Sequence, residues 1–111
     1  MSMDRAEALN QIVTFGPERK RAIAVLASYD YDSENELFEI SQSVLINVLE
    51  KYLSDEITVE ELENWANFVE CRDDLNYEKF EANIYSLANP YLVGEINKDK
   101  INQMLLDLYA L

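Results

Sequence analysis

Residues 58–78 read TVEELENWANFVECRDDLNYE, and the first part of this stretch decides the fold class. Thr58 and Glu61 have the spacing of a capping box, in which each side chain accepts a hydrogen bond from the other residue's backbone N–H. Apolar side chains then recur three or four residues apart, as on one face of an α-helix: Leu62, Trp65, Ala66 and Val69. The stretch therefore predicts a helix over residues 59–71 whose apolar face lies in a core.

The same helical period recurs on both sides of this segment. We expect five further helices: residues 4–15, residues 17–29, residues 34–53, a helix marked by Tyr77 and ended by Asn89-Pro90, and a last helix that Asn97 caps. The helix over residues 34–53 has the longest and broadest apolar stripe, so we expect it to be central and packed on more than one side. No window alternates with period two. The sequence thus predicts an all-α fold, a single compact domain over residues 1–111 of about six helices packed as antiparallel hairpins around the long helix, or alternatively a short α-solenoid-like stack.

Composition indicates a folded protein that stays in solution. Hydrophobic residues make up 49% of the chain and aromatic residues 11%, whereas disordered acidic chains are poor in aromatic residues. The N-terminal residues lack a basic stretch followed by an apolar run, and the longest apolar run, residues 22–27, is too short to span a bilayer. The lone Cys71 argues against a disulfide framework and fits a reducing compartment. We therefore expect a cytoplasmic protein.

The negative charge is concentrated in the middle of the sequence. The formal net charge is −13, with 22 Asp and Glu against 9 Lys and Arg. Residues 30–81 hold 16 of the acidic residues and three of the basic ones, a net of −13, whereas residues 1–29 sum to +1 and residues 82–111 to −1. Such a field repels nucleic acid and anionic membranes and attracts basic proteins. The charge pattern therefore predicts a basic protein partner, with no nucleic acid and no membrane.

The residue types exclude several classes of enzyme site. The chain has no histidine, which removes Ser-His and Cys-His pairs, histidine bases and zinc sites that need imidazole. Its two glycines stand alone, so no glycine-rich loop is present to bind phosphate. Cys71 lies among acidic residues that disfavour a thiolate, and we expect it to act as a small structural or incidental side chain, as buried cysteines do. We expect no catalytic residue and no cofactor.

An acidic turn at residues 30–34 starts like a calcium-binding EF-hand loop. The sixth loop position is Asn35, where glycine is required, and the twelfth is Ser41, where a bidentate glutamate is required. We therefore predict no metal site in this turn. We interpret its acids as the solvated start of the third helix, where the helix dipole favours negative charge.

A polar stripe lies beside the apolar face of the helix over residues 59–71. Its members recur at helical spacing: Glu60, Glu63, Asn67 and Glu70. Like charges three or four residues apart destabilise a helix by about 0.2–0.5 kcal/mol per pair. For one helix alone, an ordinary solvated face is the simplest interpretation. An acidic stripe without compensating lysines nevertheless indicates selection for a property other than stability, and binding to a basic partner is the simplest such property.

Several short segments within residues 45–108 resemble a family of small helical bacterial proteins. The segments are Ile57-Thr-Val-Glu-Glu-Leu62, Trp65-Ala66, Glu70-Cys-Arg-Asp-Asp-Leu-Asn-Tyr77-Glu78 and Leu87-Ala-Asn-Pro90. The family is that of immunity proteins of contact-dependent growth inhibition and related polymorphic-toxin systems. The resemblance implies a bacterial protein that binds one cognate toxin domain, the C-terminal domain of a secreted inhibition protein, and covers its active site. Such toxins are frequently nucleases, including RNases, and nuclease domains are basic because they hold phosphate.

We therefore interpret the chain as an immunity protein that neutralises a basic toxin domain through an acidic surface. Trp65 and Val69 are expected to lie in the core, with Arg72 at the end of their helix. Asp74 is expected to begin the next helix, and the carboxylates of this joint are expected to point outward to the partner. Two alternatives remain, an acidic helical adaptor for another basic protein and a carboxylate-based enzyme. The candidate partner-binding residues are Asp30, Tyr31, Asp32, Glu34, Asp55, Glu56, Glu60, Glu63, Asn67, Phe68, Glu70, Asp73, Asp74 and Tyr77.

Overall fold

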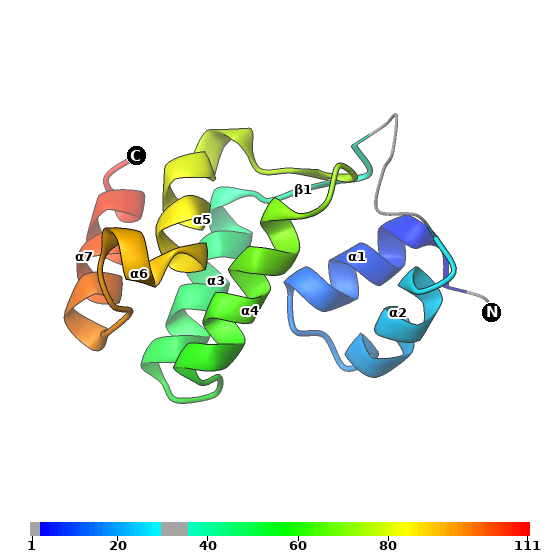
Figure 1. Cartoon of the computed structure of the whole chain (residues 1–111), viewed down its shortest axis with the longest axis horizontal. Helices are drawn as coiled ribbons and strands as arrows, with labels where there is room; N and C mark the ends of the chain where they lie inside the picture. Colours follow the sequence, from blue (N-terminus) through cyan, green and yellow to red (C-terminus); the bar gives the residue numbers. More distant parts are fainter. Residues whose placement is uncertain (1–2, 30–35) are drawn as a thin grey trace.

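The computed structural model describes residues 3–29 and 36–111 of the chain. Most of these residues are helical, and the two strands among them contain two residues each (Figure 1). The elements are α1 (Arg5–Val13), α2 (Arg19–Leu26), β1 (Phe38–Glu39), α3 (Gln42–Leu53), α4 (Val59–Glu70), β2 (Leu75–Asn76), the 3₁₀-helix η1 (Glu78–Phe80), α5 (Glu81–Ala88), α6 (Pro90–Val93) and α7 (Lys98–Tyr109). The prediction of an all-α fold is confirmed.

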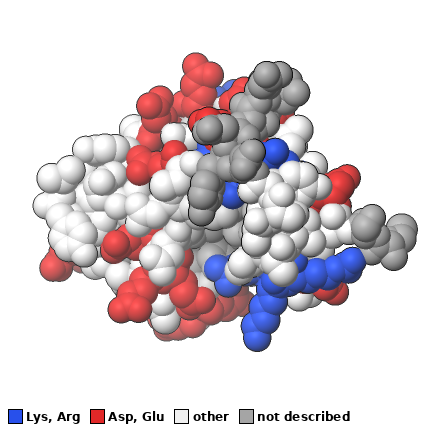
Figure 2. All heavy atoms as spheres, turned by 45° about the vertical axis from the view of Figure 1, so that its right-hand side comes forward, with Lys and Arg blue, Asp and Glu red and all other residues white. Residues whose placement is uncertain are grey.

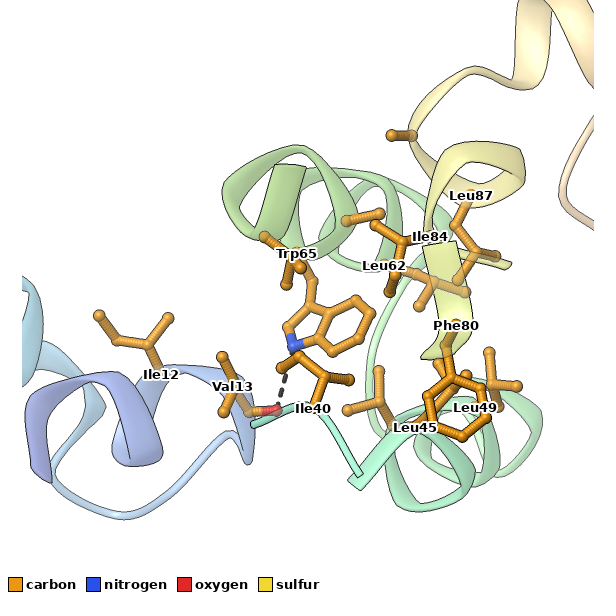
Figure 3. Close-up of a cluster of buried hydrophobic side chains, with 14 of the residues drawn as sticks. Ile12, Val13, Ile40, Leu45, Leu49, Leu62, Trp65, Phe80, Ile84 and Leu87 are labelled. Carbon is orange, nitrogen blue, oxygen red and sulfur yellow. Dashed lines mark hydrogen bonds between the residues drawn. The ribbon is translucent and has the colours of Figure 1, made fainter. Parts of the chain in front are cut away.

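Helices α3, α4, α5 and α7 form the body of the molecule, and α1 and α2 form a helical hairpin beside it (Figure 1). The α3 helix contacts both α4 and α7, so it packs on more than one side, as predicted. The α4 helix also packs against α5. Between these helices lie fully buried side chains of the body core (Figure 3): Leu45, Leu49, Leu62, Ile84 and Leu87.

Trp65 connects α4 to the hairpin. Its side chain is buried, and the indole Nε1–H donates a hydrogen bond to the backbone carbonyl of Val13 over 3.0 Å (Figure 3). Val13 is the last residue of α1, where carbonyl groups lack partners within the helix. The indole satisfies one of these carbonyls while its ring fills the core. The prediction that Trp65 lies in the core is confirmed.

Local side chains fix the starts of four helices. Thr58 and Glu61 form the predicted capping box, with hydrogen bonds of 3.1 Å from Glu61 N–H to Thr58 Oγ1 and 3.0 Å from Thr58 N–H to Glu61 Oε1. Asn97 caps α7, as predicted, by accepting a hydrogen bond from Lys100 N–H over 2.8 Å. The same kind of cap begins α1 and α3, at Asp4 and Ser41.

The prediction of one long helix over residues 34–53 is wrong. The α3 helix begins at Gln42 and, with 12 residues, has the same length as α4 and α7. The hydroxyl of Ser41 accepts a hydrogen bond from Val44 N–H over 3.2 Å and so caps the helix at this point. The residues just before the cap pair with another segment instead, because β1 lies parallel to β2.

Smaller differences concern α2 and α6. The α2 helix is shorter than the predicted range of residues 17–29, and its apolar residue Ile23 is 51% exposed. Asn89-Pro90 ends α5, as predicted, but Pro90 also begins the unpredicted helix α6. Proline fits this first helical position because its fixed φ suits a helix and its missing N–H has no partner there.

Candidate partner-binding surface

Acidic and basic side chains are unevenly distributed over the surface. In Figure 2, red carboxylate side chains cover much of the lower left and the top, whereas a group of blue side chains projects low on the hairpin side. Lys20 and Arg21 of α2 are exposed. Arg19 is half-buried, with its Cζ atom 4.9 Å from the centroid of the Phe15 ring. The hairpin therefore carries exposed basic charge beside a few exposed acids, and most of the acidic side chains belong to the body.

The α4 stripe, defined as Glu60, Glu63, Asn67 and Glu70, lies on the flank of α4 that is turned away from the hairpin. Glu60 is exposed and the other three members are half-buried. Glu63 lines a hollow of about 560 Å³ together with Tyr91 of α6. Within residues 3–29 and 36–111, none of the three glutamates takes part in an ion pair. Their negative charge is therefore not neutralised by the described part of the chain.

The turn between α3 and α4 adds two carboxylates that already have lysine partners. Asp55 accepts a hydrogen bond from Lys98 Nζ over 2.8 Å, and Glu56 lies 3.5 Å from Lys51 Nζ. All of these side chains are at least partly exposed, and exposed ion pairs contribute about 0–1 kcal/mol each. Asp55 and Glu56 are thus reachable by a partner, but they add less net charge than the α4 stripe.

Asp73 and Tyr77 continue the acidic surface past the end of α4. Asp73 is exposed, and Tyr77 is half-buried. Burial raises the pKa of Tyr77, and the nearby charges of Glu70, Glu81 and Asp73 raise it further. The neutral phenol therefore lies among carboxylates at the Glu70 end of the α4 stripe. The structure thus brings together three of the candidate residues, Tyr77, Asp73 and Glu70.

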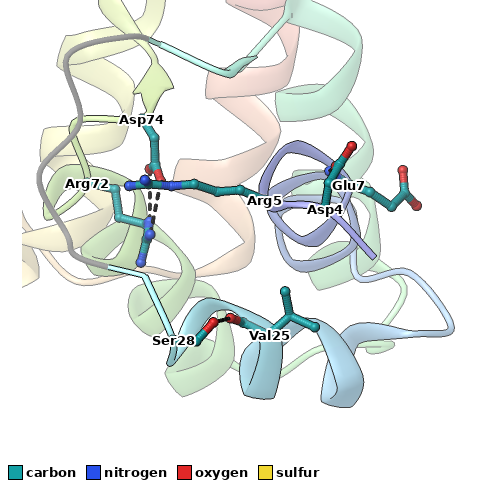
Figure 4. A network of polar contacts seen from close by, with 7 residues as sticks. All are labelled: Asp4, Arg5, Glu7, Val25, Ser28, Arg72 and Asp74. Atoms are coloured by element: carbon teal, nitrogen blue, oxygen red, sulfur yellow. Dashed lines mark hydrogen bonds and ion pairs between the residues drawn. The ribbon is translucent and has the colours of Figure 1, made fainter. Parts of the chain in front are cut away.

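Asp74 is not part of this surface, although it was expected to face the partner. Its side chain is fully buried. Arg72 donates from Nε and Nη2 to the two carboxylate oxygens over 2.9 Å each, and Arg5 Nε of α1 donates over 2.8 Å (Figure 4). Asp74 also precedes β2 rather than beginning a helix, and its carbonyl accepts a hydrogen bond from Leu37 N–H over 2.8 Å. The expectation of an outward carboxylate is therefore wrong.

The two arginines set the ionisation of Asp74. Burial alone would raise the pKa of Asp74, but the hydrogen bonds and charges of Arg72 and Arg5 outweigh this effect and hold the pKa below its ordinary value. Arg72, expected at the end of α4, is itself buried just beyond that end. The ionised carboxylate thus ties the segment after α4 to α1, which stabilises the fold and leaves nothing for a partner to contact.

Phe68 lies on the other flank of α4, away from the α4 stripe. It lines a groove of about 460 Å³ between α4 and the hairpin, with its ring centroid 5.3 Å from Arg72 Cζ. The groove also has apolar walls from α1, α2 and α4: Ile12, Ile23, Leu26 and Trp65. The predicted contact residues therefore do not form one continuous surface, because the ridge of α4 separates Phe68 from the acids.

Four of the candidate partner-binding residues belong to the acidic turn at residues 30–34. Asp30, Tyr31, Asp32 and Glu34 lie outside the described residues, and so does the turn that resembles the start of an EF-hand loop. Cys71 is exposed at the C-terminal cap of α4, so it does not pack as a buried small side chain, and an incidental role stays a prediction. In the described part of the chain, no group of three or more Asp, Glu or Cys side chains is placed to hold a metal ion.

The apolar side chains of α6 were not among the candidate partner-binding residues. Tyr91 is 91% exposed and Leu92 is 75% exposed, although both are large and apolar. The signal in the sequence is the run PYLVG at residues 90–94, in which proline and glycine enclose three apolar residues. The run is too short to show helical periodicity, so nothing in the pattern indicated whether these side chains were buried.

Comparisons with profiles of known protein families, with curated proteins and with solved structures give no match to this chain. Among the described residues, no helix combines the length and the apolar composition that a membrane span requires. A function therefore has to be inferred from the residues and their arrangement.

Proposed function

We propose that this chain is an immunity protein that binds and neutralises a basic bacterial toxin domain, a nuclease of the RNase type. The observation that carries this proposal is the α4 stripe. Glu60, Glu63 and Glu70 place three negative charges along one side of one helix, and the described part of the chain supplies no ion pair for any of them. This arrangement costs helix stability, so a partner that neutralises it accounts for its presence.

The partner class follows from the charge. A nuclease holds phosphate with Lys and Arg side chains, so its active site presents a positive field. The α4 stripe extends over about 15 Å of the helix axis, at about 1.5 Å per residue, and can meet several such side chains at once. Asp73 and Tyr77 prolong the same surface. Carboxylates in the positions of phosphates would cover the active site and would also accelerate association through long-range attraction.

Rescue of growth tests this proposal. Cells produce the chain together with the C-terminal domain encoded by the gene directly upstream, and growth is compared with cells that produce this domain alone. The wild-type chain is expected to restore growth. The triple variant Glu60→Lys, Glu63→Lys, Glu70→Lys is expected to fail, because it opposes a positive surface to a positive cleft. Circular dichroism establishes that the variant remains helical.

A matched variant controls for the change in net charge. It reverses three exposed acids on other parts of the chain: Glu18→Lys, Asp99→Lys and Asp107→Lys. This control is expected to protect the cells as the wild type does. If the α4 triple variant also protects them, the α4 stripe is not the interface. If the wild type binds the domain but growth is not restored, the chain acts as an adaptor rather than as an inhibitor.

A further inference from the structure

The short helix α6 holds apolar side chains that the fold leaves uncovered. Tyr91 is 91% exposed, Leu92 is 75% exposed and Val93 is 49% exposed, and no residue of α6 is buried. In Figure 1, α6 lies on the side of the body away from the α1–α2 hairpin. Single exposed apolar residues are common on protein surfaces, but a contiguous group indicates a binding site. We call Tyr91, Leu92 and Val93 the α6 knob.

The backbone around the α6 knob is fixed by local interactions. Pro90 begins the helix, and Gly94 ends it with φ of 129°, a conformation that other residues rarely adopt. Lys100 Nζ of α7 donates a hydrogen bond to the carbonyl of Gly94 over 2.7 Å, which ties the end of α6 to the next helix. The backbone that carries the knob is therefore held at both ends, and a preorganised backbone loses less conformational entropy on binding.

The α6 knob lies beside the α4 stripe. Tyr91 and Glu63 line the same hollow of about 560 Å³, and Glu95 and Val59 line it as well. Val59, at the start of α4, is 40% exposed and extends the apolar area. Carboxylates of α4 and of the segment after α6 thus border an exposed aromatic side chain. Interfaces commonly combine such a central apolar anchor with a charged rim.

We propose that the α6 knob is the hydrophobic anchor of the interface and inserts into an apolar pocket that Lys and Arg side chains border on the basic partner. This inference rests on the proposed function and names the contact that the acidic surface lacks, because charge alone gives little specificity. Phe68, an aromatic candidate for partner binding, faces the groove beside the hairpin and is not next to this surface. The anchor limits dissociation, whereas the α4 stripe accelerates association.

A second copy of the chain is a poorer occupant of this surface. In a twofold dimer the same patch meets itself, so Glu63 and Glu95 of both copies would be brought together. Each chain also carries a formal net charge of −13. The charge around the knob therefore favours a basic partner over self-association.

Binding kinetics with the upstream-encoded C-terminal domain test the anchor. The double variant Tyr91→Ala, Leu92→Ala is expected to bind about 100-fold more weakly than the wild type, chiefly through faster dissociation. Its melting temperature is expected to be unchanged, because neither side chain is buried. The control variant Leu106→Ala, Leu111→Ala removes apolar side chains that are 63% and 79% exposed elsewhere. This control is expected to bind as the wild type does.

The outcomes separate the anchor from the proposed function. Wild-type affinity for the double variant, with binding still lost in the α4 triple variant, would overturn the anchor alone. Absence of binding by the wild-type chain would overturn the proposed function and the anchor with it. Sedimentation velocity is expected to show a monomer at the concentrations of the binding assay. A dimer that the double variant abolishes would assign the knob to a second copy and overturn the proposal.

Discussion

Glu70 and Asp74 lie four residues apart in the acidic middle of the chain, yet they differ in burial and in ion pairing. Asp74 is fully buried and accepts three hydrogen bonds from Arg72 and Arg5. Glu70 lies on the flank of α4 and forms no ion pair with the described residues. These two acidic residues therefore have different roles. Asp74 is neutralised inside the molecule and stabilises it, whereas the charge of Glu70 remains on the surface.

The α1–α2 hairpin contributes to the neutralisation of Asp74. Arg5 comes from the near-neutral N-terminal third of the chain and reaches the carboxylate that follows α4 (Figure 4). Together with the hydrogen bond from Trp65 to Val13, this contact holds α1 against the body. The same hairpin carries none of the α4 stripe, so fold stability and partner binding can be tested by separate substitutions.

The largest expected loss of stability follows removal of the buried carboxylate of Asp74. Asp74→Ala leaves the charge of buried Arg72 without this partner, and breaking a buried ion pair costs about 3–5 kcal/mol of unfolding free energy. Urea denaturation followed by circular dichroism measures the loss. The exposed neighbour provides the control, because Asp73→Ala is expected to change the free energy by less than about 0.5 kcal/mol. Equal effects of the two substitutions would show that burial of Asp74 contributes little to stability.

A smaller loss of unfolding free energy is expected at low pH. Because the two arginines hold the pKa of Asp74 below its ordinary value, the folded state binds this proton less readily than the unfolded state does. The resulting stability is fully present above the unfolded pKa of about 3.9 and is lost as the pH falls through the folded pKa. The difference in unfolding free energy between the wild type and Asp74→Asn is therefore expected to shrink below about pH 4. Urea midpoints at about pH 7 and about pH 2 measure it, and a difference that stays constant would contradict this origin.

The smallest expected change in unfolding free energy follows a substitution in the α4 stripe, and it is an increase. Glu63→Gln removes one like-charge contact, with Glu60 three residues earlier, and is expected to raise the unfolding free energy by about 0.2–0.5 kcal/mol. The same substitution is expected to slow association with the upstream-encoded domain and to reduce its salt dependence. Urea denaturation and association rates at low and high salt measure the two effects. A loss of stability would mean that Glu63 belongs with Asp74, as a carboxylate that the fold requires.

The helices could be predicted because their signals are local. A capping bond such as that between Thr58 and Glu61 joins residues three positions apart, and an apolar face repeats within one turn. The starts of α4 and α7 and the burial of Trp65 followed from such signals. The start of α3 was missed although Ser41 supplies a local cap, because the apolar residues before it also fit a helical stripe. Their pairing with residues 75–76 was not visible in the local pattern.

By itself, the sequence determined the helical class, the starts of α1, α4 and α7 and the concentration of negative charge between residues 30 and 81, since each depends on residue types and short spacings. Only the tertiary structure decided which charged side chains form ion pairs inside the fold. Arg5 and Asp74 are 69 residues apart and meet because the hairpin packs against the segment after α4. Tertiary packing likewise left Tyr91 and Leu92 of α6 uncovered. Burial depends on which distant elements come to lie against a side chain, and no local pattern records that.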